Sequence, residues 1–157
     1  MCGILGYASY SYSVDKERLV KNIDLLSHRG PDDSGIWESE DGMVMLFHRR
    51  LSIVDLDDGH QPMMDTSGSL TIVFNGEIYN YKKIFKILSK GYRFKTKSDT
   101  EVILAAYSEW GADCVMHLDG MFAFTIYDSI FLWPVKLMKN FVSRKFLSKI
   151  LIKCCWR

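Results

Sequence analysis

The residue with the greatest chemical potential stands second in the chain, in the opening sequence MCGILG. If the initiator Met1 is removed, Cys2 carries its thiol beside a free α-amine. The thiolate is the nucleophilic form, and a free thiol has a pKa near ~8.5, so it needs a base. An α-amine titrates near ~7.7–8.0 and can take up that proton. Cys2 therefore fits an N-terminal nucleophile, although a lone cysteine more commonly serves as a small buried side chain.

Further polar groups follow predicted strands or open predicted helices. Arg49 and Arg50 follow a strand-like run, and an arginine there could bind a carboxylate with both arms of its guanidinium group. The sequence Asn75-Gly76-Glu77 follows another strand-like run, where the Asn amide and the Gly N–H could stabilise developing negative charge. Asp99 lies where a helical pattern starts, with Ser98 before it. Each pattern also has an ordinary interpretation, respectively a solvated arginine, a tight turn and a helix cap.

The apolar periodicity predicts three helices and several strands that position these groups. Helical spacing starts at Asp15, at about Ile78 and at Ser98 or Asp99, with ends at the sequence HRGP, at Gly91 and at Gly111. Strand patterns cover residues 2–8, 34–38, 43–48, 70–74, 92–96 and 121–127, with a hairpin signal at Asp41-Gly42. Antiparallel strands with helices packed outside them form an α+β layered domain.

Length and composition are those of one globular domain, with 157 residues, 48% hydrophobic and 25% charged. Residues 1–128 contain 13 basic and 19 acidic side chains, which gives no argument for nucleic-acid binding. The four cysteines show no spacing typical of a metal site or a disulfide framework, which favours a reducing compartment. Neither a secretory signal nor an apolar run of ~20 residues is present. We therefore expect a cytoplasmic protein with no metal and no membrane partner.

Residues 129–157 have a different composition, with seven Lys and Arg side chains and no acid. The abrupt change suggests out-of-frame translation, a hypothesis that resequencing of the locus tests. A rival hypothesis makes this stretch a basic amphipathic segment that docks on a membrane or a partner helix. Phe141, Arg144 and Lys145 fall at helical spacing but do not give one clean apolar face.

Six blocks, taken together, resemble the glutaminase domain of class II glutamine amidotransferases, in the glutamine-hydrolysing asparagine synthetase branch. They extend in the family's order from Met1 to Asp128: MCGILGY, HRGPDDSG, HRRLSIVD followed by GHQPM, FNGEIYNY, SDTEVILAAY and DGMFAF. Sister amidotransferases that make glucosamine phosphate or phosphoribosylamine share the leading Cys but lack the Pro-Asp after HRG, the RLSIVD run and the NGEIYN form. The resemblance implies an N-terminal-nucleophile hydrolase fold, an αββα sandwich of two antiparallel sheets that is incomplete at its C-terminus.

The resemblance also implies the role of each site residue. Cys2 would attack the side-chain amide of glutamine and form a thioester, with its own α-amine as base and then as acid. Asn75 and Gly76 would stabilise the oxyanion. Arg50 would hold the α-carboxylate of glutamine, and Glu77 and Asp99 its α-ammonium group. The glutamine-binding set is Arg50, Leu51, Ile53, Val54, Asn75, Gly76, Glu77 and Asp99.

After Asp128 the resemblance ends. The family continues with an Ala-Arg-Asp block and a synthetase domain, in which MgATP activates aspartate to accept the ammonia. We therefore expect a truncated glutaminase domain over residues 2–128, a divergent basic tail over 129–157, no synthetase domain and no cofactor in this chain. Two functions stay open: a glutaminase that releases glutamate and ammonia, and a catalytically inactive fragment that at most binds glutamine. A domain that lacks strands would expose unpaired sheet edges.

Overall fold

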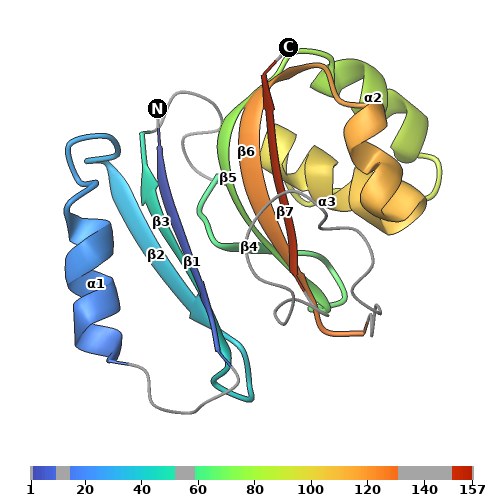
Figure 1. Ribbon diagram of the computed structural model, residues 1–157. Helices are drawn as coiled ribbons and strands as arrows, with labels where there is room; N and C mark the ends of the chain where they lie inside the picture. The colour runs from blue at the N-terminus through green and yellow to red at the C-terminus, as the bar shows by residue number, and fades with distance from the viewer. Residues whose placement is uncertain (1, 10–14, 52–58, 131–149, 157) are drawn as a thin grey trace.

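The computed structural model describes residues 2–9, 15–51, 59–130 and 150–156, the last of these as backbone only. Two antiparallel sheets face each other and carry helices on their outer sides, so that the described chain has four layers (Figure 1). This arrangement buries one face of each sheet against the other sheet and the second face against helices.

The first sheet contains three strands in the order β1-β3-β2: β1 (Gly3–Ala8), β3 (Val44–Arg50) and β2 (Asp33–Glu38). Helix α1 (Lys16–Asp24) covers its outer side (Figure 1). The Asp15 side chain caps this helix by accepting a hydrogen bond from the Arg18 N–H at 3.0 Å, as its position before the apolar pattern predicted.

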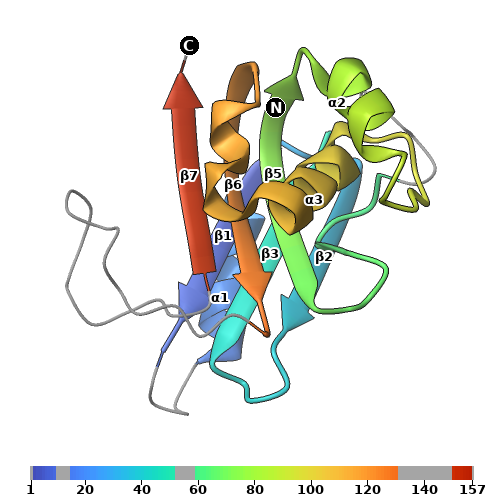
Figure 2. The same cartoon turned by 90° about the vertical axis from the view of Figure 1, so that its right-hand side faces the viewer.

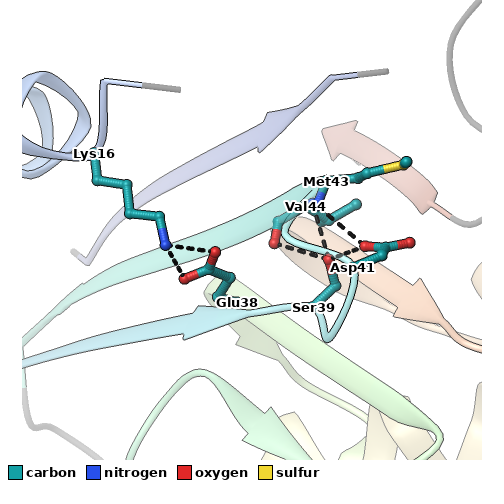
Figure 3. Close-up of polar contacts among 6 residues, drawn as sticks. All are labelled: Lys16, Glu38, Ser39, Asp41, Met43 and Val44. Carbon is teal, nitrogen blue, oxygen red and sulfur yellow. Dashed lines mark hydrogen bonds and ion pairs between the residues drawn. The ribbon is translucent and has the colours of Figure 1, made fainter. Parts of the chain in front are cut away.

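Side chains close the connection between β2 and β3 and tie it to α1 (Figure 3). Asp41 accepts hydrogen bonds from the Ser39 hydroxyl at 2.6 Å and from the Met43 N–H at 3.1 Å. Lys16, the first residue of α1, forms an ion pair with Glu38 at the end of β2, with 2.6 Å between Nζ and Oε1. The hairpin predicted at Asp41-Gly42 is confirmed.

The second sheet has the order β4-β5-β6-β7: β4 (Met63–Met64), β5 (Leu70–Ile78), β6 (Gly120–Asp128) and β7 (Ile150–Trp156). Helices α2 (Tyr81–Leu88) and α3 (Asp99–Trp110) cover its outer face, and a short 3₁₀ helix, η1 (Gly111–Met116), follows α3. Figure 2 shows α2 and α3 in front of β5 and β6, with β7 at the edge.

Three groups of buried apolar side chains hold the layers together. The largest lies between the second sheet and its helices and includes Phe124, Ile126 and Ile103. Alternation along β3 divides its side chains between two faces. Leu46 and its neighbours contact Val73 and Tyr127 of the second sheet, whereas Met45 and Phe47 pack with Ile23 of α1; the two smaller groups are Val44, Leu46, Val73 and Tyr127, and Ile23, Met45 and Phe47.

Three predictions about the elements were wrong, two of them helix boundaries. The first helix ends at Asp24, before the HRGP sequence, and residues 25–29 form turns. The second begins at Tyr81, not Ile78, because β5 continues through Ile78 in register with Gly120 of β6.

The third error is the strand predicted over residues 92–96. The Lys95 and Thr96 N–H groups donate instead to the Glu101 carboxylate, at 2.9 and 2.6 Å. A side chain thus binds the backbone groups that a neighbouring strand would have needed.

The C-terminal stretch contributes a strand that the periodicity did not indicate. Residues 150–156 pair with β6 in an antiparallel register that runs from Met121↔Trp156 to Tyr127↔Ile150. An exposed strand edge offers unpaired N–H and C=O groups to another segment. Along β6, strand β7 is the segment that pairs with these groups. Phe141, Arg144 and Lys145 lie outside the described residues. Among those described, no helix has the length and apolar character needed to cross a membrane.

Candidate active site

A cleft of about 230 Å³ opens where the first sheet, the second sheet and the start of α3 meet. Its lining residues are Cys2, Arg50, Leu51, Gly59, Gln61, Phe74, Asn75, Gly76, Glu77, Ser98, Asp99, Thr100 and Met121. Every described residue that the sequence predicted for the site is in this set. Ile53 and Val54 lie outside the described residues. In the part of the chain that the structure describes, no three His, Cys, Asp or Glu side chains are arranged to hold a metal ion.

Cys2 immediately precedes β1 and is half-buried at the cleft. Its sulfur lies 3.4 Å from the Leu51 nitrogen, which donates to it, and 3.8 Å from the Leu51 carbonyl oxygen. The Arg29 Nε–H donates to the Cys2 carbonyl at 3.3 Å. Arg29 belongs to the HRGP sequence, which was interpreted only as a helix end. The structure shows that this turn also fixes the backbone of Cys2.

Arg50 is the last residue of β3 and lies opposite Asp33 of β2. It is buried, with 6% of its surface exposed. His60 contacts the Asp33 carboxylate, with 2.6 Å between Nδ1 and Oδ2. Burial raises the pKa of Asp33, but hydrogen bonds from His60 and the Ser34 N–H outweigh burial and hold that pKa below its usual value; the charge of Arg50 acts in the same direction.

Asn75, Gly76 and Glu77 lie within β5 and not in the tight turn that was their ordinary interpretation. They pair in register with residues of β6, and Gly76 is opposite Phe122. Gly76 has a φ of 149°, and a Cβ added there would lie 2.2 Å from the Met121 carbonyl oxygen. Position 76 therefore accepts only glycine without displacing β6.

Asp99 is the first residue of α3 and is buried beside the cleft, with 9% of its surface exposed. Burial raises its pKa, and the negative charge of Glu77 adds to this; hydrogen bonds from the Ile78 and Thr100 N–H groups act in the opposite direction. A buried carboxylate is stable when a cation or hydrogen-bond donors compensate it. The Asp99 and Glu77 carboxylates therefore make this end of the cleft a favourable place for a positively charged group.

Sequence reasoning missed six lining residues: Gly59, Gln61, Phe74, Ser98, Thr100 and Met121. Ser98 has the ordinary capping role, because its hydroxyl accepts from the Glu101 N–H at 3.2 Å. Gln61 belongs to the GHQPM block, to which no role had been given. The block was the available signal, but spacing alone does not indicate that a glutamine side chain turns into a cleft.

Beneath the cleft, His48 links the two sheets. Its Nε2 lies 3.1 Å from the Phe74 carbonyl oxygen, and because a carbonyl accepts, Nε2 carries the proton. Burial lowers the pKa of His48 to about 4, and the positive charge of Arg50 acts in the same direction. The ring is therefore neutral near pH 7. Its Nδ1 is buried without a hydrogen-bond partner among the described residues.

Comparison with known proteins shows what this chain is similar to. A family model described as a glutamine amidotransferase domain matches residues 1–131. The chain is 43% identical over 133 residues to asparagine synthetase [glutamine-hydrolyzing] 3 of Bacillus subtilis, covering 82% of this chain and 21% of that protein. It is 42% identical over 133 residues to asparagine synthetase B [glutamine-hydrolyzing] of Escherichia coli, covering 82% of this chain and 23% of that protein. The chain thus spans under a quarter of the length of these relatives.

Among solved structures, the glutamine phosphoribosylpyrophosphate amidotransferase of B. subtilis superposes with a TM-score of 0.60 at 19% identity. The match covers 82% of this chain and 35% of that one. It confirms the predicted N-terminal-nucleophile sandwich of two antiparallel sheets. The family model matches the same residues that build the cleft, and so does the identity to the first quarter of glutamine-hydrolysing asparagine synthetases. This chain therefore belongs to the glutamine amidotransferase family.

Proposed function

We propose that this chain hydrolyses glutamine to glutamate and ammonia, with Cys2 as the nucleophile. One observation carries the proposal: the Cys2 thiol, the Arg50 guanidinium group and the carboxylates of Glu77 and Asp99 line the same small cleft. Free glutamine has an amide to attack, a carboxylate and an ammonium group. The cleft offers a group of matching chemistry for each of them.

The chemistry begins at Cys2 once Met1 has been removed. The α-amine of Cys2 takes the thiol proton, and the thiolate attacks the side-chain carbonyl carbon of glutamine. The C–N bond then breaks, the departing nitrogen takes the proton from the α-ammonium group, and ammonia leaves. Water, deprotonated by the same amine, hydrolyses the thioester to give glutamate and restores the thiol.

Asn75 and Gly76 stabilise the oxyanion that forms at each attack. In an antiparallel strand the N–H groups of alternate residues point to the same side. The Phe74 N–H donates to Gln61 and the Ile78 N–H donates to Asp99, both away from β6. The same alternation directs the intervening Gly76 N–H away from β6 and toward the cleft. Loss of one such donor typically lowers the rate by ~10²–10³.

The binding groups divide by charge. Arg50 binds the α-carboxylate of glutamine, for which its planar guanidinium group is better suited than the ammonium group of lysine. Glu77 and Asp99 bind the α-ammonium group. Leu51, together with Ile53 and Val54, completes the pocket for the carboxylate end.

In a full-length relative, we propose that the ammonia passes to a synthetase domain. There it amidates aspartate that MgATP has activated. The hydrolysis of glutamine that we propose for this chain uses no cofactor. A reducing compartment such as the cytoplasm suits the mechanism, because the reaction requires Cys2 as a thiol.

The deciding experiment measures glutamate release and intact mass on the full 157-residue chain. We expect loss of the Met1 mass, glutamine-dependent glutamate release, and a fall to the uncatalysed background in Cys2→Ala. Cys114→Ala is the matched control, since Cys114 is buried away from the cleft and does not line it. Release that persists in Cys2→Ala contradicts the mechanism.

Processed chain without turnover, and without labelling of Cys2 by an electrophilic glutamine analogue, supports the alternative of an inactive fragment. A second variant tests the binding assignment. Arg50→Lys keeps the charge but loses the planar fork, so we expect a higher KM for glutamine with a smaller change in kcat. An unchanged KM would remove Arg50 from the carboxylate site.

A further inference from the structure

Gln61 is a buried polar side chain of the cleft to which the proposed mechanism gives no role. It lies before β4 and has 5% of its surface exposed. Its backbone carbonyl packs against β2 so closely that a Cβ at Gly35 would lie 2.0 Å from that oxygen. The backbone of Gln61 is therefore held against the first sheet, while its side chain reaches the second.

Both ends of the Gln61 amide are hydrogen-bonded to different elements. Its Oε1 accepts from the Phe74 N–H of β5 at 2.7 Å. Its Nε2 donates to the Thr100 hydroxyl at the start of α3, at 3.2 Å. The amide thus connects β5 to α3 across the edge of the cleft.

Asp99 closes this connection into a ring. It precedes Thr100 in α3 and accepts from the Ile78 N–H of β5 at 3.2 Å. From Phe74 the path runs through Gln61 to Thr100 and Asp99, and from there back to β5 at Ile78. Gly76 is midway along the strand segment that the ring encloses.

Among the described residues, no strand pairs with this edge of β5 beyond Ile72. The pairing of β4 with β5 covers only Met63↔Ile72 and Met64↔Thr71. Gln61 stands two residues before Met63, where the ladder would next reach Phe74, and its side-chain amide replaces the missing strand. A neighbouring strand would have bound the Gly76 N–H as well. The Gln61 side chain binds only the Phe74 N–H, so the Gly76 N–H can donate to a ligand in the cleft.

We infer that Gln61 is a positioning residue, which holds the Gly76 N–H and the Asp99 carboxylate at a fixed separation by bridging Phe74 to Thr100. This inference rests on the proposed function. Misplacement of a reacting group by about 1 Å can cost ~100-fold in rate, so a bridge of this kind acts on the reaction without touching the reacting atoms.

Four variants of the full chain test the bridge. Gln61→Met keeps the length of the side chain and removes both hydrogen bonds, and we expect kcat for glutamine to fall about tenfold or more. Thr100→Val removes only the bond to α3, and we expect a several-fold rise in KM with a smaller effect on kcat. Thr100→Ser retains the hydroxyl and is expected to restore near wild-type values. Ile84→Val, at a buried core position of α2, controls for a general loss of stability.

The kinetic results decide between positioning and mere stability. A Gln61→Met chain with kcat and KM within twofold of wild type overturns the inference. The same is true if Ile84→Val, at an equal loss in melting temperature, lowers kcat as much. Alkylation of Cys2 by iodoacetamide is expected to be equal in all variants, because the bridge does not contact the thiol.

Amide hydrogen exchange provides a readout that does not depend on turnover. In Gln61→Met we expect faster exchange at residues 74–78 and in the first turn of α3, with β6 unchanged. Unchanged exchange in these segments overturns the bridge even if the chain proves inactive. If wild type lacks glutaminase activity while Gln61→Met shows local loosening, the proposed function fails and the bridge stands.

Discussion

The two halves of the sandwich are covered very differently. The second sheet lies beneath α2 and α3 and shares with them a core of seventeen buried side chains among the described residues. In the described part of the chain, the first sheet is covered by α1 alone, with a core of three buried side chains: Ile23, Met45 and Phe47. Eight residues of α3 are buried, whereas a single residue of α1 is. We therefore expect the half with the second sheet, here called the platform, to be the more stable one. The half with the first sheet, the lightly held half, has fewer buried contacts to its helix.

This difference matters because the cleft takes its groups from both halves. Cys2 directly precedes β1 and Arg50 ends β3, whereas the proposed oxyanion donors lie in β5 and Asp99 begins α3. Contacts between the sheets, such as the hydrogen bond from His48 to Phe74, therefore set the distance from Cys2 to the proposed oxyanion donors. A change in the lightly held half can misplace the nucleophile while the platform stays folded.

The largest expected effects compare the two cores. Phe124 and Phe47 are both fully buried. Truncation of a buried Phe to Ala costs about 3–5 kcal/mol, and the cost is lower where neighbours can relax into the cavity. We expect Phe124→Ala near the upper end and Phe47→Ala near the lower end, because α1 can shift toward the first sheet. Urea unfolding of both variants measures this, and a reversed order would contradict the comparison.

The next effect concerns the hydrogen bond between the sheets and depends on pH. The pKa of His48 is about 4 in the folded chain, below its ordinary value of 6.5. The unfolded chain therefore takes up a proton first as pH falls. The stabilisation from neutral His48 is complete above pH 6.5 and is lost progressively toward pH 4, in total about 3 kcal/mol.

Urea unfolding between pH 4 and 8 checks this sign. His48→Gln, which retains a donor for the Phe74 carbonyl, should show a flatter dependence over that window. The raised pKa of Asp99 acts in the opposite sense, because its folded form gains protons more readily. Equal pH slopes in wild type and His48→Gln would exclude His48 as the source.

The sequence predicted the chemical groups of the cleft better than their surroundings. The resemblance to the amidotransferase family assigned Arg50 and Asp99 to the two charged ends of a zwitterionic ligand, and both line the cleft. Their roles stay predictions. The local sequence pattern was sufficient to predict that Ser98 and Asp15 cap helices, because a cap side chain bonds to a residue three positions further on.

What the sequence did not indicate depends on contacts between distant residues. The strand interpretation of residues 92–96 failed because Glu101 takes two of its N–H groups. Gln61 was missed because its partners, Phe74 and Thr100, are 13 and 39 residues away. β7 pairs across the same kind of distance, with β6. Periodicity reports which face of an element is buried, and it carries no information about such partners.

A smaller effect compares the two helix caps. Loss of an N-cap side chain costs about 1 kcal/mol, and more where the cap is buried. Ser98 is buried before α3 and Asp15 is exposed before α1, so we expect Ser98→Ala to destabilise the chain more than Asp15→Ala. Ser98→Ala should also raise the KM for glutamine, because it loosens the first turn that carries Asp99, whereas Asp15→Ala should leave KM unchanged. Thermal melts with glutaminase assays on both variants separate the two effects.

The smallest expected effect is that of the ion pair between Lys16 and Glu38, which joins α1 to β2 (Figure 3). The Lys16 side chain is 57% exposed and that of Glu38 34%, so water screens the pair. Exposed pairs contribute about 0.2–1 kcal/mol, and salt weakens them. We expect a double-mutant cycle of Lys16→Ala and Glu38→Ala to give a coupling energy in that range, falling toward zero in high salt. A salt-independent coupling well above it would mean that polar contacts, and not the three-residue core, hold α1 on the first sheet, and the contrast between the halves would then be smaller than their cores indicate.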